Sequence, residues 1–465
     1  MTTTTPGATQ LLGNFAVQTS ADAIPAEVMN KGAYCLLDAL GLAILAREEK
    51  TFVAVESLLA PLAGGPNSAR VWSSGRRVSL SDAVTANAVA VHGQFHDDTD
   101  YSSWTHPGSL IVPVALSVGD SEDLSVTEVL RSIVIGYDAI EWLGARAEVG
   151  RALIERGVRT SPTLGTVGAA ASAAALLGLD AAQAGHAIGI ASSITGGVLE
   201  PVRSGSDEWR VQNARAASGG LMAAQLARQG IAGAPTGLEG PKGLAHSMAG
   251  LRTLPARWAT GPDVAAILGV SAKPWATLGD NMSAVVAAKL IHDEGIRAAD
   301  IESVRIHIWR HFTEYPGTSY RGPFDRIGQA LASMAFATAG MLVYGELEYD
   351  KSSDHRQDPA ILSLIERITI EPDDQGDPYK ADVKVVFKDG RVIHKHASEA
   401  APAQLFHDAP TALALFESRL LRSGYASGAG TVLATKVLKA ASGRQGTRIR
   451  EVLDALAPGV AGTPA

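Results

Sequence analysis

The chain has 465 residues and a mass of 48.3 kDa, and at about 150 residues per domain this length predicts two or three domains. Forty Lys and Arg against 48 Asp and Glu give a net charge of −8, which excludes the basic surface that nucleic-acid binding needs. Hydrophobic residues make up 46% of the chain and charged residues 19%, as in folded proteins, whereas aromatic residues are only 5% and glycines number 48. We therefore expect helices that pack closely through small side chains.

Cysteine content and the N-terminal segment exclude further structural features and indicate where the protein is located. Cys35 is the single cysteine, so intrachain disulfides and zinc clusters built from cysteines are excluded. The start, Met-Thr-Thr-Thr-Thr-Pro-Gly, has neither a basic nor an apolar region, so we expect no secretory signal and a cytoplasmic location. Residues 160–179 carry no charge but are rich in Ala, Gly, Ser and Thr, which indicates a buried core helix and not a membrane span.

In chain order, the first 265 or so residues have an almost entirely helical pattern. In residues 26–46 the apolar side chains recur at steps of mostly three and four positions. Six further segments share this periodicity: residues 81–95, 109–118, 125–146, 164–177, 181–193 and 211–229. Two of them contain glycines among alanines, at Gly165 and Gly168 and at Gly219 and Gly220, which favours close approach of neighbouring backbones.

The pattern changes near residue 268. Alternating apolar residues predict four strands of one antiparallel sheet: residues 301–309, 368–371, 381–387 and 391–396. The last two are separated by Asp389-Gly390, a dipeptide typical of a hairpin turn. Helical periodicity is found between the strands and after them, in residues 281–294, 329–344, 403–421 and 440–456.

This order of elements predicts a mainly α protein of two parts. A large all-helical domain, residues 1–268 and 402–465, is interrupted by a smaller α+β domain, residues 269–401, which would form a lid.

Several kinds of site are disfavoured by the sequence. Neither the glycine-rich motifs of nucleotide-binding proteins nor the Gly-x-Ser-x-Gly motif of serine hydrolases occurs, so we expect no cofactor. His92 and His96 have the i, i+4 spacing of a metal-binding pair, but this spacing alone is a weak signal. The pairs His307/His311 and His394/His396 lie on or beside predicted strands, where we expect them to decorate the sheet surface, and no metal is expected.

Residues 92–108 are the most informative segment, with acids, histidines and a Thr-His-Pro-Gly turn between two apolar helices. Such a concentration of titratable groups suggests the wall of a pocket. The segment resembles the Asp-Asp-Thr…Thr-His-Pro-Gly signature of the MmgE/PrpD family, which contains 2-methylcitrate dehydratases, cis-aconitate decarboxylases and an iminodisuccinate epimerase. The resemblance continues in the family's order at residues 156–166, 205–217, 221–230, 273–275 and 320–324. It implies a large helical domain with an α+β lid.

The resemblance also implies a set of catalytic residues. His106 matches the family's catalytic histidine, Lys273 and Tyr320 would face it from the α+β domain, and Asp97 and Asp98 would shape the same pocket. Removal of a proton next to a carboxylate needs a base, which His106 would supply, and the developing enolate needs a cation, which Lys273 would supply. Tyr320 would act as an acid, or as a base on the opposite face if Lys273 lowers its pKa.

The sequence departs from the family pattern at three further positions. Where the family usually reads Arg-Gly-Phe-His-Pro-Thr, this chain has Arg159 in place of the histidine. Where the family usually reads Ser-Asp-Thr-Lys-Arg-Leu-His, Trp209 replaces the lysine and Gln212 the final histidine. We expect Arg159 and Arg210 to bind substrate carboxylates, with Trp209 and Gln212 beside them.

These substitutions guide the expected reaction. Loss of acid–base residues with retention of His106, Lys273 and Tyr320 favours a cofactor-independent epimerase or isomerase of a small di- or tricarboxylate, similar to iminodisuccinate epimerase. A lyase that dehydrates a 2-methylcitrate-like hydroxyacid is the alternative, and a family member without catalytic activity is a third. Members of this family are commonly dimers, so a homodimer that binds no nucleic acid and no membrane is expected.

Overall fold

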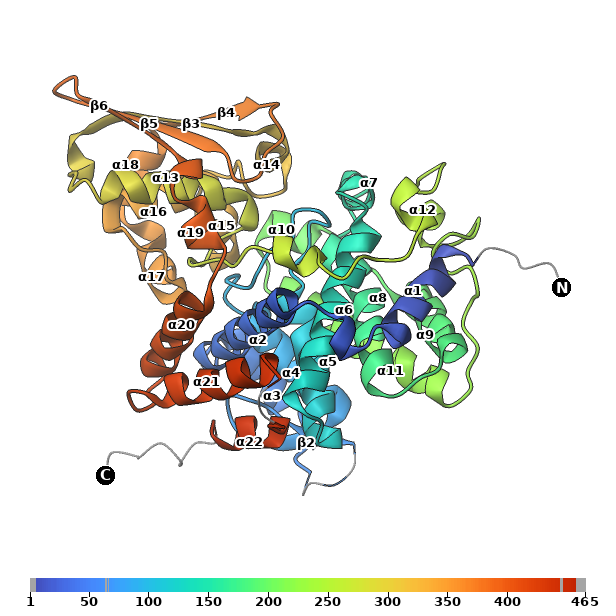
Figure 1. Cartoon of the computed structure of the whole chain (residues 1–465). Helices are drawn as coiled ribbons and strands as arrows, with labels where there is room; N and C mark the ends of the chain where they lie inside the picture. Colours follow the sequence, from blue (N-terminus) through green and yellow to red (C-terminus); the bar gives the residue numbers. More distant parts are fainter. Residues whose placement is uncertain (1–5, 63–64, 66, 444–445, 457–465) are drawn as a thin grey trace.

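The computed structural model describes residues 6–62, 65, 67–443 and 446–456. Residues 1–5, which contribute to the expectation of no secretory signal, lie outside the described residues. The fold is mainly helical, with a small mixed sheet in the C-terminal part, so the predicted fold class is confirmed (Figure 1). In Figure 1 the sheet lies at the upper left with helices beneath it, and the larger helical part fills the rest of the molecule.

The helical part contains four helices of 17 to 20 residues, α2, α6, α8 and α11, together with shorter ones. Its helices before residue 250 are α1 (Ala8–Gln18), α2 (Ala26–Leu45), α3 (Lys50–Ser57), α4 (Leu80–His92), α5 (Gly108–Glu122), α6 (Val126–Gly144), α7 (Glu148–Glu155), α8 (Thr160–Leu176), α9 (Ala181–Ile194), α10 (Glu200–Ser204), α11 (Trp209–Arg228) and α12 (Leu244–Ser247). The seven helices expected from periodicity all form, whereas α1, α3, α7, α10 and α12 were not predicted. A short antiparallel hairpin, β1 (Ser68–Arg70) with β2 (Arg77–Ser79), corrects the expectation of helix alone in this region.

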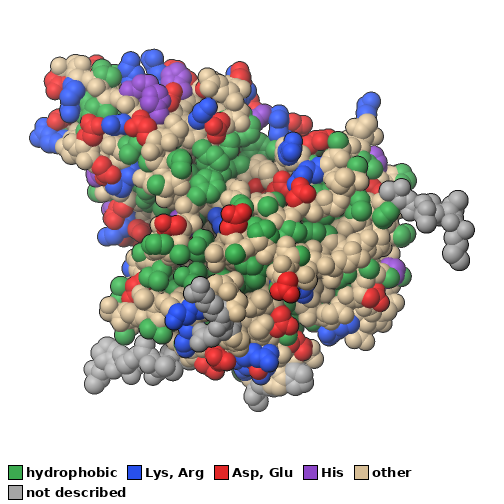
Figure 2. All heavy atoms as spheres, in the orientation of Figure 1, with side chains coloured by type: hydrophobic (Ala, Val, Ile, Leu, Met, Phe, Trp, Pro, Cys, Tyr) green, Lys and Arg blue, Asp and Glu red, His purple; other side chains and the backbone are tan. Residues whose placement is uncertain are grey.

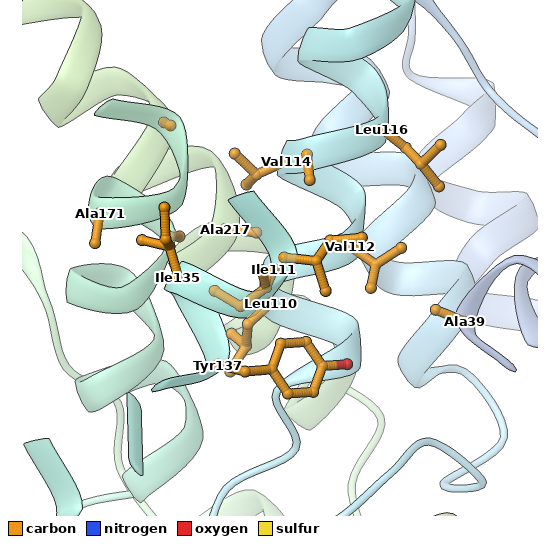
Figure 3. Packing of buried hydrophobic residues seen from close by; sticks show 14 of the residues in the cluster. Ala39, Leu110, Ile111, Val112, Val114, Leu116, Ile135, Tyr137, Ala171 and Ala217 are labelled. Atoms are coloured by element: carbon orange, nitrogen blue, oxygen red, sulfur yellow. The ribbon is translucent and has the colours of Figure 1, made fainter. Parts of the chain in front are cut away.

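The helix α5 lies at the centre of this part. Every residue of α5 from its start to Ser121 is buried, and its apolar side chains meet those of α2, α6, α8 and α11 (Figure 3). The uncharged stretch predicted as a core helix is α8, of which nearly all residues are buried. Burial of this much apolar surface is the main stabilising contribution to the fold.

Glycines allow these helices to approach closely, as the sequence predicts. A Cβ atom on Gly220 of α11 would lie 2.5 Å from the Cβ of Ala169 on α8, and one on Gly168 would lie 2.4 Å from Ile140 of α6. Gly165 is equally confined, by Leu110, but Gly219 has its nearest neighbour at 3.6 Å. Alanine at the first three positions would therefore push the helices apart.

The α+β part contains a four-stranded sheet, with one face packed on helices. Its elements are α13 (Met282–His292), β3 (Ile301–Trp309), α14 (Arg310–Glu314), α15 (Ile327–Ala332), α16 (Met334–Tyr344), α17 (Tyr349–Asp354), α18 (Pro359–Ile365), β4 (Ile368–Asp373), β5 (Ala381–Phe387) and β6 (Val392–His396). The strand order is β4-β3-β5-β6, and a second core forms between the sheet, α13, α16 and α18.

The sheet is mixed, so the prediction of an all-antiparallel sheet is wrong for one pair. β3 pairs with β4 in parallel, whereas β3 with β5 and β5 with β6 are antiparallel. The chain between β3 and β4 passes through five helices, a crossover long enough to bring the second strand back in the same direction. The Asp389-Gly390 turn joins β5 to β6 as predicted, with Gly390 at φ 85°.

Three predicted helices are divided in the structure. The expected helix 329–344 is interrupted at Ser333, which caps α16 by accepting a hydrogen bond from the Phe336 amide at 3.1 Å. The last expected helices, 403–421 and 440–456, correspond to α19 (Ala401–Leu405), α20 (Ala409–Arg422), α21 (Ala429–Ala441) and α22 (Ile449–Asp454). Side chains that cap helices, such as Ser333 and Asp408, end the periodic pattern where apolar spacing alone does not.

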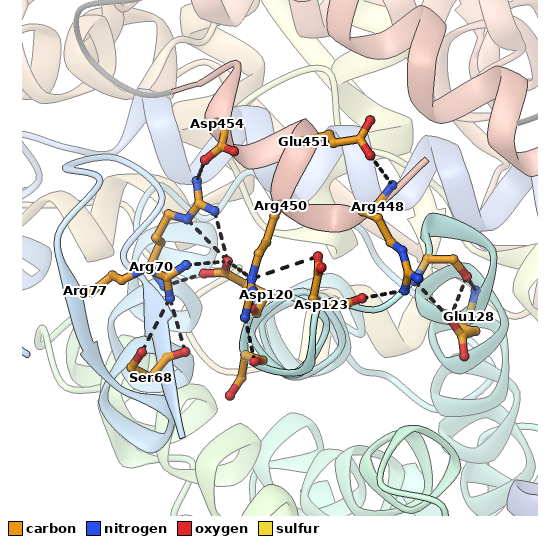
Figure 4. A network of polar contacts seen from close by, with 12 residues as sticks. Ser68, Arg70, Arg77, Asp120, Asp123, Glu128, Arg448, Arg450, Glu451 and Asp454 are labelled. Atoms are coloured by element: carbon orange, nitrogen blue, oxygen red, sulfur yellow. Dashed lines mark hydrogen bonds and ion pairs between the residues drawn. The ribbon is translucent and has the colours of Figure 1, made fainter. Parts of the chain in front are cut away.

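The C-terminal helices pack on the helical part. α20 and α21 lie against α2, and α22 lies against α5. Asp120 at the end of α5 is fully buried and accepts hydrogen bonds from Arg70 of β1 and Arg77 of β2, while Arg450 of α22 stands 3.9 Å away (Figure 4). This ion-pair network connects segments that are far apart in the sequence.

The surface carries charges of both signs. On the face in Figure 2, acidic and basic side chains are interspersed, consistent with the small net charge. One described helix, α2, is long and apolar enough to cross a bilayer, but 78% of its most apolar stretch is buried inside the protein. The apolar character of α2 is explained by its place in the hydrophobic core of the helical part.

Candidate functional site

The segment between α4 and α5 forms a compact loop at the junction of the two cores. Asp100 and Thr105 pair as a small bridge, and Thr99 pairs with Ser271, which brings the chain around Lys273 against this loop. Phe95 and Trp104 have positive φ angles of 56° and 55°. Left-handed backbone at bulky residues is strained and is concentrated at functional sites.

His106 is held through its Nδ1 atom, and among the residues that the structure describes no hydrogen bond engages its Nε2 atom. Its Nδ1 lies 2.8 Å from the carbonyl oxygen of Asp98, which can only accept, so Nδ1 carries the proton and Nε2 is left with a lone pair. Burial, together with the nearby charge of Lys273, holds the pKa of His106 well below its usual range. The first turn of α8 supports the segment, because Ser161 Oγ accepts from the His106 amide at 3.1 Å. His106 is therefore a neutral base at pH 7.

Asp98 positions His106 through its backbone carbonyl, and protein groups engage both of its carboxylate oxygens. Its Oδ1 accepts from the Gly108 amide at 2.7 Å and its Oδ2 from the Tyr137 hydroxyl at 2.7 Å. Burial raises its pKa to about 7. A Cβ atom on Gly108 would lie 2.8 Å from Asp98 Oδ1, which explains why the Thr-His-Pro-Gly turn ends in glycine.

His92 and Asp97 form a buried pair beside His106. His92 Nδ1 lies 2.7 Å from Asp97 Oδ2, and its Nε2 lies 2.8 Å from Nη2 of Arg159. A guanidinium can only donate, so Nε2 accepts and Nδ1 donates to the carboxylate. Burial, aided by Arg159, lowers the pKa of His92 to about 4. Although burial acts to raise the pKa of Asp97, its interaction with His92, including the hydrogen bond from Nδ1, and the charge of Lys273 lower it and keep the carboxylate ionised.

Lys273 is a buried cation next to this group. Its Nζ donates to the carbonyl of Phe95 at 2.7 Å and to that of Thr277 at 3.1 Å, and it lies 4.9 Å from the centre of the Phe95 ring. Burial lowers its pKa to about 8, opposed mainly by the charge of Asp97. At pH 7 most molecules carry the charged ammonium, but its proton is less tightly held than that of a surface lysine.

Two aromatic side chains fill the space in front of these groups. The Phe95 and Trp209 rings lie 4.4 Å apart, Phe95 lies 5.7 Å from the His106 ring, and Trp209 lies 4.7 Å from the His92 ring. The cavity beside Phe95 and Trp209 measures about 10 Å³, about enough for one water molecule. A ligand larger than a water molecule therefore does not fit in this cavity unless a side chain moves.

The arginines predicted to bind carboxylates are occupied by protein atoms. Arg159 donates from Nη1 to the Trp209 carbonyl at 2.5 Å and to Gln212 Oε1 at 3.0 Å. Arg210 donates to the Gly93 carbonyl at 2.7 Å and lies 4.1 Å from the Trp209 ring. Arg159 contacts His92, whose ring lies 5.4 Å from that of His106. Arg210 packs against the ring of Trp209.

Tyr320 and Tyr315 occupy different places. The Tyr320 hydroxyl donates to the Pro323 carbonyl at 2.5 Å, and within the described residues no contact joins Tyr320 to His106 or Lys273. Tyr315, five residues earlier, packs against the cluster of Phe95 and Trp209, and the charge of Arg159 acts on its hydroxyl. Burial raises the pKa of Tyr315, so it is a proton donor and not a base.

A larger cavity lies beside Tyr315. Its volume is about 240 Å³, and it lies between the two domains, with Trp104 and Arg151 on one side and His311 and Tyr315 on the other. This volume approaches the lower end of typical small-molecule sites. It is the candidate route by which a ligand reaches the loop.

Three groups in the site were missed by the sequence reasoning. His92 carries no motif of its own beyond its i, i+4 spacing to His96, and Tyr315 lies outside the matched Tyr-Arg-Gly-Pro-Phe segment. Asp280 is buried and within electrostatic reach of Lys273, and burial raises its pKa to about 7. Only the fold brings these residues together, because they come from three separate segments.

The His92/His96 pair does not have the arrangement of a metal site. Both nitrogens of His92 are engaged by Asp97 and Arg159, whereas neither ring nitrogen of His96 has a hydrogen-bond partner among the described residues. Among the described residues, three side chains that could bind a metal lie close together on the sheet: Asp382, His394 and His396.

Two family models cover most of the chain. The MmgE/PrpD N-terminal domain matches residues 10–256, and the MmgE/PrpD C-terminal domain matches residues 282–412. The chain belongs to the MmgE/PrpD family. The resemblance predicted from residues 92–108 is therefore confirmed.

Named relatives in the family are distant. A cis-aconitate decarboxylase-like protein oryM from Aspergillus oryzae is 26% identical over 233 residues, which cover 48% of this chain and 47% of the relative. The cis-aconitate decarboxylase of Aspergillus terreus is 23% identical over 48% of this chain and 46% of its own length. The human cis-aconitate decarboxylase is 27% identical over 213 residues, which cover 44% of this chain and 43% of the relative. The aligned part of the chain thus spans about half the length of these MmgE/PrpD relatives.

Proposed function

We propose that this chain is a cofactor-independent enzyme that moves a proton at a carbon next to a carboxylate of a small di- or tricarboxylate, as an epimerase or isomerase. The observation that carries the proposal is the pairing of a neutral base with a buried cation. His106 presents an unprotonated Nε2, and the Lys273 ammonium is near enough to depress its pKa. Family membership supports carboxylate chemistry.

The two groups divide the work in a proton transfer. Nε2 of His106 takes the proton from carbon, and the electron pair moves onto the adjacent carboxylate to give an enolate. The ammonium of Lys273 stabilises the added negative charge, which is strongest in a site that excludes water. With a pKa of about 8, Lys273 can also return a proton to carbon, which inverts the centre if it acts on the opposite face.

Recognition of the substrate carboxylates falls to Arg159 and Tyr315. Arg159 is buried, and its partners Gln212 and the Trp209 carbonyl are neutral acceptors. A substrate carboxylate is a stronger acceptor than either, so it can replace them when Trp209 moves. The Tyr315 hydroxyl, held protonated by burial, can donate a second hydrogen bond.

An epimerase needs fewer acid–base groups than a dehydratase. A dehydratase must remove a carbon-bound proton and also protonate the departing hydroxide. The positions at which the family usually carries histidine and lysine hold Arg159 and Trp209 here, and neither can serve as that acid at neutral pH. This supports proton transfer without loss of a group from the substrate.

A lyase is the second candidate, because the named relatives are cis-aconitate decarboxylases. The same base and cation would serve it, since loss of carbon dioxide also places negative charge on the α-carbon. A protein without catalysis is the third, and the filling of the site by Phe95 and Trp209 favours it.

Proton NMR in deuterium oxide distinguishes the three. The purified protein is incubated with iminodisuccinate, 2-methylcitrate, cis-aconitate and simpler dicarboxylates. Deuterium uptake at the α-carbon without new olefinic signals is expected, and new olefinic signals or carbon dioxide would identify a lyase. His106→Ala should reduce the rate by about 10²- to 10⁴-fold, as expected for loss of a general base. His307→Ala, on the exposed sheet face, is the matched control for loss of a histidine.

A second variant tests whether the filled site blocks turnover. Phe95→Gly empties the space before His106 and suits the positive φ at this position. If Phe95→Gly binds carboxylates but neither it nor the wild type exchanges any α-proton, the catalytic proposal is wrong and a binding role remains.

A further inference from the structure

The outer face of the sheet carries a row of histidines and acids across all four strands. Register pairs Glu371 of β4 with His307 of β3, His307 with Asp382 of β5, and Asp382 with His396 of β6. His394 lies two residues before His396 on the same strand; both are exposed, Lys395 between them is half-buried, and Ile393 before them is buried. Figure 2 shows histidines gathered on this part of the molecule.

Three of these side chains converge. Asp382, His394 and His396 each place a ligand atom within 4.8 Å of those of the other two. The two imidazole rings lie 4.5 Å apart, and His396 Nδ1 makes a short contact with Asp382 Oδ1. Two imidazoles and one carboxylate on a paired hairpin are a donor set that suits divalent transition metals.

We propose that Asp382, His394 and His396 bind a divalent transition-metal ion of the Zn²⁺ type on the outer face of the sheet. The ion takes the place of the proton shared by His396 and Asp382, and small rotations of the exposed rings bring the nitrogens to bonding distance. Because the β5–β6 hairpin fixes the three residues in register, little backbone rearrangement is needed. The proposal contradicts the expectation that these histidines only decorate the surface.

The surroundings leave room for further ligands. A hollow of about 220 Å³ adjoins the site and is lined by His307, Asp373, Asp382 and His396, among others. Water or a bound anion can complete the coordination from this side. The register places Lys384 opposite His394, so the ammonium reduces the affinity but does not remove a ligand. Lys395, between the histidines, is paired with Glu294 at 2.6 Å and faces away.

This site is separate from the loop that holds His106. The opposite face of the sheet is covered by α13, α16 and α18, and the ligands come from β5 and β6 alone. Its loss should therefore leave proton exchange at the α-carbon of a substrate unchanged, so failure of the metal proposal is distinguishable from failure of the proposed function.

Titration calorimetry of the untagged, EDTA-treated full chain with Zn²⁺, and visible spectroscopy with Co²⁺, test the proposal. One ion per chain is expected, with visible bands typical of a nitrogen- and oxygen-liganded Co²⁺. His394→Ala, His396→Ala and Asp382→Asn should each weaken binding by at least about tenfold, since each removes one of three ligands. Circular dichroism checks that the exposed substitutions leave the fold intact.

His307→Ala is the matched control, because His307 lies on the same face and is held by Glu371 at 3.0 Å instead of joining the three. His307→Ala should change the affinity for the ion by less than about twofold, because His307 supplies no ligand to it. The proposal is wrong if the wild type binds no ion, or if His394→Ala and His396→Ala bind as tightly as the wild type.

Discussion

The Nδ1 atom of His92 donates its hydrogen to Asp97 at 2.7 Å, while Arg159 donates to the other ring nitrogen of the same histidine. Both nitrogens are therefore used, and His92 is held neutral in one orientation. The arginine that replaces the family's usual histidine thus engages a second histidine inside the site. The carboxylate of Asp97 stays ionised beside Lys273 and helps to keep that lysine charged.

The buried lysine should set an alkaline limit on activity. Lys273 has a pKa of about 8, lowered by burial from an ordinary value near 10.5. If the ammonium stabilises the enolate, kcat/KM should fall above pH 8 by about tenfold per unit. The acid limb should lie well below pH 6, because the pKa of His106 is depressed. A pH profile of deuterium exchange measures both limbs, and an alkaline limb near pH 10 would contradict the role of Lys273.

Tyr315 and Tyr320 offer a direct comparison. Tyr315 lies by Arg159 and the ring of Trp209, whereas the Tyr320 hydroxyl is bound to the Pro323 carbonyl. Tyr315→Phe should raise KM about tenfold through the loss of one hydrogen bond to a charged group, and Tyr320→Phe should have a smaller effect. Steady-state kinetics of both variants decide the matter, and the reverse order would restore Tyr320 to the site.

Gly108 should not tolerate a side chain. Alanine there places its Cβ 2.8 Å from Asp98 Oδ1, and either the carboxylate or α5 must shift. We expect a loss of about 1–3 kcal/mol in the free energy of unfolding and loss of the His106 orientation. Gly261→Ala is the control, because its added Cβ would meet nothing within 4 Å. Urea unfolding of the two variants measures the difference, and equal stabilities would refute the steric explanation.

Asp120 should matter for stability although it is far from the site loop in the sequence. The carboxylate is fully buried and accepts from Arg70 and Arg77. Asp120→Ala leaves the Arg77 guanidinium without its carboxylate partner and Arg70 with Asp454 alone, which should cost about 3 kcal/mol. The exposed pair of Arg203 and Glu200 is the control, where Glu200→Ala should give no measurable change in Tm. Calorimetry of both variants compares them.

Asp280 should make the fold less stable as the pH rises. Burial raises its pKa to about 7 in the folded chain, whereas the unfolded group has its ordinary value near 3.8. Between these values the folded state holds a proton that the unfolded state releases, so the free energy of unfolding falls as pH increases from about 4 to 7. Asp280→Asn should remove the contribution of Asp280 to the fall in unfolding free energy with pH. The contribution of Asp98, whose pKa is also raised, should remain. Unfolding at pH 5 and pH 8 tests it, and identical slopes would contradict it.

Much of the fold follows from local patterns in the sequence. The seven helices predicted before residue 265 formed because their apolar faces recur at helical spacing, and the four strands formed because theirs alternate. The direction of β4 did not follow, since pairing depends on how the helices between β3 and β4 return the chain. The breaks at Ser333 and before Asp408 arise from single capping side chains within otherwise continuous periodicity.

The site could be predicted only where a motif marks it. The Thr-His-Pro-Gly turn identified His106, and its order in the chain identified Lys273, which the structure brings to the same loop. Tyr315 and His92 reach this loop through tertiary packing, which no spacing in the sequence encodes. The filling of the space by Phe95 and Trp209 also depends on packing, because either ring could have pointed elsewhere. The homodimer and the cytoplasmic location stay predictions.

Cys35 gives the molecule a practical advantage for measuring domain motion. It is the single cysteine, it is buried, and its pKa is raised to about 12, so it reacts slowly with maleimides at neutral pH. Cysteines introduced at Arg151 and Glu314, on opposite walls of the 240 Å³ cavity, would then carry a donor and an acceptor dye with little background labelling. Energy transfer between the dyes would report in real time how far the two walls separate when a carboxylate is admitted.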